Sequence, residues 1–203
     1  AVAAINPILA VVAAIALAVK FLKGAVDAAR EFAENSEQLS KDLGVSYVHA
    51  ERLNREIIEA SKNGAKILPD EMRSVMVGLN KELGTAAAYS QELATDIALG
   101  AAAFGASLDT ATQITGQFMK MGMSATDAST ELNELMIEAN ASGLDVNSVM
   151  EDVASASKSV RHYFKGSVKE LAKAAIKAAK MGTTLESTVE SMRGMDDIGS
   201  VFE

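Results

Sequence analysis

An uninterrupted apolar run near the start of the chain is its most prominent hydrophobic feature. Residues 8–19 read Ile-Leu-Ala-Val-Val-Ala-Ala-Ile-Ala-Leu-Ala-Val. Asn6 and Pro7 precede the run, which suits the start of a helix because proline lacks the N–H that would have no partner in the first turn. We therefore predict a helix here, whose larger side chains form a membrane-insertion or packing segment. These are Ile8, Leu9, Val11, Val12, Ile15, Leu17 and Val19.

The length of this run bears on whether it can enter a membrane. Twelve residues at a rise of ~1.5 Å cover about 18 Å, which is short of the ~30 Å hydrocarbon core of a bilayer. Counting from Ala1 to Val19 approaches a full span, at the cost of including Asn6. Lys20 and Lys23 follow the run and could reach lipid headgroups. Membrane engagement and burial against other helices both stay open at this point.

A second pattern continues along the same predicted helix. Apolar residues recur at steps of three and four, the spacing that keeps one stripe facing a partner helix. The members of this seam are Leu22, Ala25, Ala29, Phe32, Ser36, Leu39 and Leu43. The seam predicts either a coiled coil between copies of the chain or an amphipathic helix packed within one chain. Its short length and its Ala and Ser members leave both alternatives open.

Beyond residue 43 the chain becomes a series of short patterns with helical periodicity, and no segment alternates like a strand. Met72, Val75, Met76 and Leu79 are typical of these one-sided apolar stripes. The pattern predicts an all-α fold, an Ala-rich helical array in which a long N-terminal helix precedes short helix–Gly–helix units. We predict two domains, 1–43 and 44–203.

Glycines separate the predicted helices in a recurrent way. Each junction begins with a glycine, which ends one helix. In most junctions an apolar residue comes next, and a Ser, Thr or Asp that can cap the following helix completes the junction. The junctions are Gly44-Val45-Ser46, Gly122-Met123-Ser124, Gly143-Leu144-Asp145, Gly166-Ser167 and Gly182-Thr183. Nine of the fourteen glycines fall about twenty residues apart, at 24, 44, 64, 84, 105, 122, 143, 166 and 182. This spacing fits a repeated one-helix unit, and it also fits helices of ordinary length, each of which needs a stop.

Composition narrows the classes of function. The chain has 203 residues, of which 49% are apolar but only 4% are aromatic, so we expect close helix-on-helix packing of small side chains. The net charge of −8 argues against sequence-blind binding to duplex DNA, and we expect no sequence-specific nucleic-acid partner. The absence of cysteine excludes disulfides and thiolate metal sites.

Candidate chemistry is sparse. The two histidines, His49 and His162, belong to no metal-binding or nucleophile motif, and no phosphate-binding loop is present. His162 lies in the basic and aromatic segment 160–165, which resembles contacts to single-stranded nucleic acid, but its place before Gly166 favours a connector between helices. We interpret the acidic pair at 196–197 as solvated. We therefore expect no catalytic residue, no metal and no cofactor, and a protein that is not an enzyme.

The Asn6-Pro7 start, the apolar run and its Lys20-Phe21-Leu22-Lys23 exit resemble the hydrophobic segment of phage tail tape-measure proteins. The sequence from 164 to 186 resembles the helix–Gly–helix units that follow such segments. The resemblance covers most of the chain and is strongest over 1–43 and 164–203.

The resemblance implies a virion protein inside the tail tube that sets tail length and leaves ahead of the genome. Its implied partners are tail-tube and baseplate or tail-tip proteins, and the host membrane during infection. Together with the seam, a ring-shaped tail axis favours a small homo-oligomer, most simply a trimer. Because the chain starts at Ala1 without methionine, we expect a fragment of a longer protein, forming a compact portion near one tail end.

Two other functions stay open. The first is a helical pore-forming or membrane-permeabilising protein, in which residues 8–19 and 97–106 form a hydrophobic hairpin that is hidden until insertion. The second is a non-viral helical scaffold.

Overall fold

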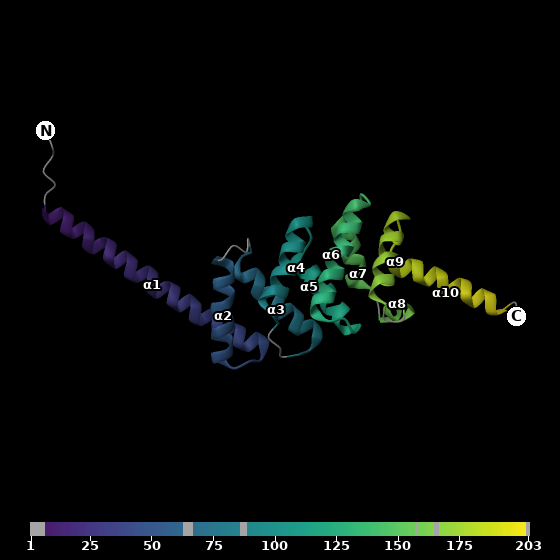
Figure 1. The fold of residues 1–203 in the computed structure, drawn as a ribbon, viewed down its shortest axis with the longest axis horizontal. Helices are drawn as coiled ribbons and strands as arrows, with labels where there is room; N and C mark the ends of the chain where they lie inside the picture. Colours follow the sequence, from purple (N-terminus) through teal and green to yellow (C-terminus); the bar gives the residue numbers. More distant parts are fainter. Residues whose placement is uncertain (1–6, 63–66, 86–88, 157, 165–166, 202–203) are drawn as a thin grey trace, which may run out of the picture. The chain divides into compact units, whose positions relative to one another are not determined.

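The computed structural model describes residues 7–62, 67–85, 89–156, 158–164 and 167–201. Of these residues, the side chains are described from Val19 to Arg193, except at position 158. Helices make up 84% of the chain, and the described residues contain no strand, so the predicted all-α fold is confirmed (Figure 1). The helices are α1 (Pro7–Leu43), α2 (Tyr47–Lys62), α3 (Pro69–Leu83), α4 (Gln91–Phe104), α5 (Leu108–Lys120), α6 (Ala125–Ala141), α7 (Val146–Ser155), α8 (Lys158–Tyr163), α9 (Val168–Lys180) and α10 (Leu185–Val201).

The chain divides into two compact units, Ala1–Arg55 and Glu56–Glu203. The domain boundary predicted after residue 43 coincides with the end of α1. The division between the units falls later, because Asn54 of α2 donates a hydrogen bond back to Ser36 of α1. The first unit therefore contains α1 and the first part of α2.

α1 is one continuous helix of 37 residues. At ~1.5 Å per residue it is about 55 Å long. Its apolar first part, its Lys-containing middle and its seam belong to a single element, as the sequence predicts. Whether α1 forms a coiled coil with other copies of the chain stays a prediction.

The second unit is a two-layered array of helices. α3 packs against α5, and α5 packs against α7, so these three helices form one layer; α4, α6 and α9 form the other. Each layer also contacts the other, through pairs such as α3 with α4 and α5 with α6. α10 packs against α7, α8 and α9. Leaving out the short α8, most helices of the array thus contact the helix that follows them in sequence and the one after that. This pattern is typical of stacked helical repeats.

The junctions between helices follow local rules that the sequence predicts. At Gly143 the backbone turns with a φ of 70°, a left-handed conformation that costs glycine little. The N–H of Leu144 donates to the carbonyl of Ala139 at 3.1 Å and ends α6, and Asp145 caps α7 by accepting from the N–H of Ser148 at 2.7 Å. Positive φ is also found at Gly44, Gly84, Gly105, Gly122 and Gly182, whereas Gly166 lies outside the described residues.

The repeating unit of the array contains two longer helices, α5 with α6 and then α7 with α9, and the short α8 lies between α7 and α9 in the second of these repeats. Gly105, Gly143 and Gly182 begin similar segments, Gly-Ala-Ser-Leu-Asp, Gly-Leu-Asp-Val-Asn and Gly-Thr-Thr-Leu-Glu, at spacings of 38 and 39 residues. Two of these starts lie side by side, because Asn147 donates to the Gly105 carbonyl and accepts from the N–H of Ser107, both at 2.9 Å. The spacing near twenty residues thus follows single helices only in part, because Gly24 lies inside α1, and the similar segments recur at about twice that spacing.

Glycines also allow helices within a layer to approach closely. A β-carbon at Gly78 of α3 would stand 2.7 Å from Cγ2 of Thr112 on α5. A β-carbon at Gly100 of α4 would overlap the side-chain amide of Asn133 on α6. A larger residue at either position would therefore require the neighbouring side chain to move.

Candidate functional site

The titratable residues singled out from the sequence lie on different helices. His49 is half-buried in the first turn of α2, where its backbone N–H donates to Oγ of Ser46 at 3.4 Å. His162 is exposed on α8, and the side chains at 196–197 lie outside those described. Over the described residues, no group of three or more His, Cys, Asp or Glu side chains could hold a metal ion.

The basic and aromatic cluster of α8 takes part in packing. The rings of Tyr163 and Phe164 meet edge to face with centroids 5.5 Å apart, and the guanidinium of Arg193 lies 5.9 Å from the Tyr163 ring centroid. Arg193 also donates to the carbonyl of Ser159 at 2.7 Å. These contacts join α8 to α10, so at least part of the cluster is engaged within the chain.

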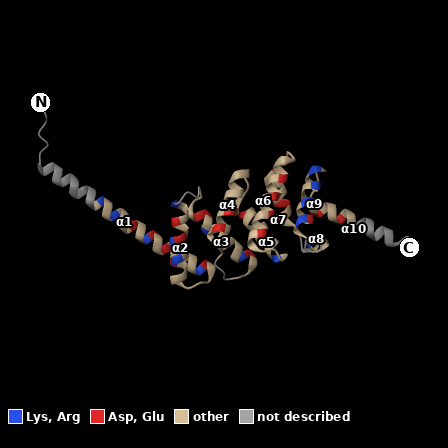
Figure 2. Ribbon diagram, in the orientation of Figure 1, with Lys and Arg blue, Asp and Glu red and all other residues tan. Residues whose placement is uncertain are grey.

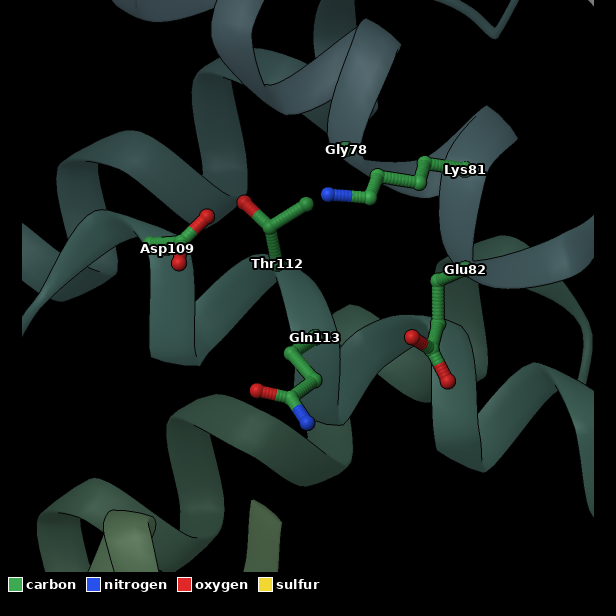
Figure 3. Close-up of a pocket in the computed structure, with 6 residues that line it drawn as sticks. All are labelled: Gly78, Lys81, Glu82, Asp109, Thr112 and Gln113. Atoms are coloured by element: carbon green, nitrogen blue, oxygen red, sulfur yellow. The ribbon is translucent and has the colours of Figure 1, made fainter.

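Figure 3 shows an open pocket of about 260 Å³ between α3 and α5. It is lined by Gly78, Lys81, Glu82, Asp109, Thr112 and Gln113. Lys81 extends toward Thr112, and the carboxylate of Asp109 lies on the far side of that threonine. Glu82 is already paired with Lys120, at 2.9 Å. Gly78 lines the pocket without a side chain, and the mixture of charges around it favours no single ligand.

A second cavity of about 260 Å³ lies where α7 meets the turn between α9 and α10. Its side chains include Asp152, which accepts a hydrogen bond from the N–H of Leu185 at 2.7 Å. Burial raises the pKa of Asp152, the Leu185 N–H opposes the rise, and Glu186 adds to it. Asp152 therefore serves as a cap for the start of α10, supplied by another helix.

The predicted membrane or packing segment is only partly described. Its backbone belongs to α1, but the side chains of residues 8–17 lie outside those described. Val19 is the described member, and 59% of its surface is exposed. Among the residues that the structure covers, no helix combines the length and the apolar content needed to cross a bilayer.

The C-terminal half of the seam is buried. Leu39 and Leu43 are almost completely inaccessible, and Phe32 is half-buried. Between them lies Ser36, whose hydroxyl donates to the Phe32 carbonyl at 2.8 Å and accepts from the amide of Asn54 at 2.9 Å. The hydrogen-bonded pair Ser36–Asn54 is fully buried, so this half of the seam already has a partner within the chain.

The N-terminal half of the seam is exposed. Leu22 is 63% exposed, and Ala25 and Ala29 are exposed as well. Val26 and Phe21, which the seam does not include, are also exposed beside it. Val26 lies four residues after Leu22, so the two side chains share one face of the helix, and this spacing in the sequence was enough to include Val26 in the seam.

The exposed surface of α1 from Val19 to Ala29, which we call the open seam, is the best candidate for a functional site. Comparison with protein-family models, curated proteins and solved structures finds no match. The site must therefore be interpreted from its own chemistry. A row of large apolar side chains on a helix is costly in water, at ~25 cal/mol per Å², and is relieved by another helix or by lipid.

Proposed function

We propose that this chain is a structural segment of a phage tail tape-measure protein. The single observation that carries the proposal is the open seam. It belongs to the same apolar stripe of α1 as the buried residues Leu39 and Leu43, but it is exposed. The sequence resemblance over 1–43 and 164–203 supplies the protein class. In this role the chain lies in the tail lumen or tail tip, contacts tail-tube and baseplate or tail-tip proteins, and leaves with or before the genome.

Self-association through the open seam is part of the proposal. The buried pair Ser36–Asn54 closes the seam on its C-terminal side, so other copies have the residues from Val19 to Ala29 available. A ring-shaped tail favours a symmetric set of α1 helices, most simply three. The second unit, Glu56–Glu203, then forms a compact portion that follows this helical stem in sequence.

A test in particles separates assembly from delivery. We would replace Val12 by Asp, which places one charge in the middle of the apolar run, and measure tail assembly and genome delivery separately. Normal tails with blocked delivery support a membrane step during infection, and failed assembly indicates that the run serves packing. Purified tails that lack the wild-type chain altogether would contradict the tape-measure proposal.

A pore-forming or membrane-permeabilising protein is the second candidate. It is favoured by the same open seam, because Phe21 and Leu22 are exposed between Lys20 and Lys23, an arrangement suited to a membrane surface. Release of dye from anionic vesicles by the purified chain alone supports this candidate. Vesicles that stay intact, together with recovery of the chain from tails, favour the tape measure.

A further inference from the structure

Two neighbouring helices of the second unit carry opposite charges. Four lysines of α9 follow one another at steps of four, four and three residues, which places them on one face of the helix, and all four are exposed. α6 has four acidic residues and no basic one (Figure 2). The lysines are Lys169, Lys173, Lys177 and Lys180, and the acids are Asp127, Glu131, Glu134 and Glu138.

The surroundings of Glu131 indicate that both rows belong to one surface. α6 and α9 are in contact. Burial raises the pKa of the Glu131 carboxyl, Lys169 and Lys173 of α9 lower it, and Glu134 and Glu138 of its own helix raise it further. Lysines and acids thus lie within electrostatic reach of the same carboxyl group. We call this surface of α6 and α9 the charged face.

The lysines of the charged face have little direct neutralisation within the chain. Lys173 pairs with Glu170 at 3.4 Å, but both side chains are mostly exposed, and such pairs contribute little. Within the described residues, no ion pair joins Lys169, Lys177 or Lys180 to an acid. The ammonium groups of Lys177 and Lys180, which also do not shift the pKa of Glu131, are therefore available to an external partner.

An apolar side chain stands among the acids. Ile137 lies on α6 between Glu134 and Glu138 in sequence, and 54% of its surface is exposed. Burial of such a residue provides the apolar centre that a stable contact needs, with charges around it. The charged face has both components.

We propose that the charged face binds the charged face of a second copy of this chain, with α6 of each copy against α9 of the other. In a dimer with two-fold symmetry, the acidic row of each copy faces the lysine row of the other copy. The same contact therefore forms twice, and the surface is complementary to itself. The step of eleven residues from Asp127 to Glu138 equals that from Lys169 to Lys180, so the two rows match in length.

A second copy suits this surface better than a polyanion. Nucleic acid approaching the lysines would meet Glu134 and Glu138 beside them, and the repulsion would offset part of the attraction. A second copy neutralises both rows at once. The contact is independent of the open seam, and it goes beyond the proposed tape-measure role because it would hold in any of the candidate functions.

Salt provides the first arm of the test. The molar mass of the full chain is measured by light scattering at two ionic strengths. At about 20 mM charges are screened weakly, and at about 500 mM they are screened strongly. We expect the mass at low salt to be twice that at high salt. Association through the apolar open seam persists at high salt, so the two contacts are read separately.

Charge exchange provides the second arm. One variant carries Lys177→Glu and Lys180→Glu, and the other carries Glu134→Lys and Glu138→Lys. Each variant alone should fail to double at low salt, because like rows face each other. Their equimolar mixture should double, because both contacts of the mixed dimer become complementary.

Controls keep this test decisive. The pair Lys62→Glu and Lys81→Glu gives the same charge change on other exposed lysines and should leave the doubling intact. Circular dichroism checks that each variant is folded, and Lys177→Gln with Lys180→Gln replaces the reversed pair if that pair unfolds. A mass that is the same at both salt concentrations, or a mixture that stays at the mass of its components, overturns the proposal.

Discussion

Gly116 of α5 lies directly against the side chain of Glu82 on α3. A β-carbon at position 116 would stand 2.5 Å from Cγ and 2.9 Å from Cβ of Glu82. Glu82 is also held by Lys120, one turn further along α5, through an ion pair of 2.9 Å. α3 and α5 share the most extensive helix contact in the described part of the chain, and this glycine sets how closely they approach.

We predict that Gly116→Ala destabilises the second unit by about 1–3 kcal/mol, because the methyl group meets the inner part of a fixed side chain. The steric cost itself is larger than this net loss, because alanine gains ~1 kcal/mol over glycine in helix propensity. The free energy of unfolding in urea measures the effect.

Gly24→Ala is the matched control. Gly24 lies within α1, and a β-carbon there would meet nothing within 4 Å. We expect this variant to be as stable as the wild type or more stable, by up to about 1 kcal/mol. If Gly116→Ala behaves like Gly24→Ala, the close approach of α3 and α5 is not what requires glycine.

We predict that Asn147→Ala weakens the array by about 1–2 kcal/mol, because two hydrogen bonds between successive repeats are lost together. Asn140→Ala serves as the control, since Asn140 is exposed near the end of α6. We expect it to change the free energy of unfolding by less than about 0.5 kcal/mol. Equal effects of the two substitutions would show that the Asn147 bridge contributes nothing.

Acidification should strengthen one part of the array before it weakens another. Burial raises the folded-state pKa of Glu131 above 4.5 and that of Asp152 above 3.8. Each group's favourable contribution is fully present below its ordinary pKa and is lost as pH rises through the folded pKa. Asp145 behaves in the opposite way, because its folded pKa is lowered, first by the Ser148 backbone N–H, and its contribution is lost as pH falls through that lowered value.

Glu131→Gln tests this pH dependence. The amide cannot ionise, so we expect the variant to gain stability relative to the wild type above the folded pKa of Glu131 and to depend less on pH. Urea unfolding from pH 7 down to about pH 4 measures the slope. A variant whose stability changes with pH as steeply as that of the wild type would exclude Glu131 as the source.

The open seam gives a prediction that distinguishes association from folding. Leu22→Asp should abolish self-association at high salt and leave the stability of the monomer unchanged, because Leu22 is 63% exposed. Leu39→Asp should cost about 3 kcal/mol or more, because it places a charge in a buried position. A wild-type chain that is strictly monomeric at high concentration and high salt would remove the open seam from the proposed function.

Much of the fold could be predicted because its signals are local. Pro7 and the apolar run indicate α1, and a glycine followed by a capping residue, as at Gly143 and Asp145, marks where one helix ends and the next begins. These preferences act over a single turn of backbone, so they can be recognised from neighbouring residues without knowing the packing.

Tertiary structure alone decided how the helices pair and which surfaces stay exposed. The seam of α1 has one continuous spacing, yet Leu39 is buried and Leu22 is exposed, because the partner Asn54 reaches only one half of it. The starts of two successive repeats meet through a hydrogen bond from Asn147 to the carbonyl of Gly105, 42 residues away. Such contacts join distant parts of the chain, and their energy depends on distances that periodicity and composition do not specify.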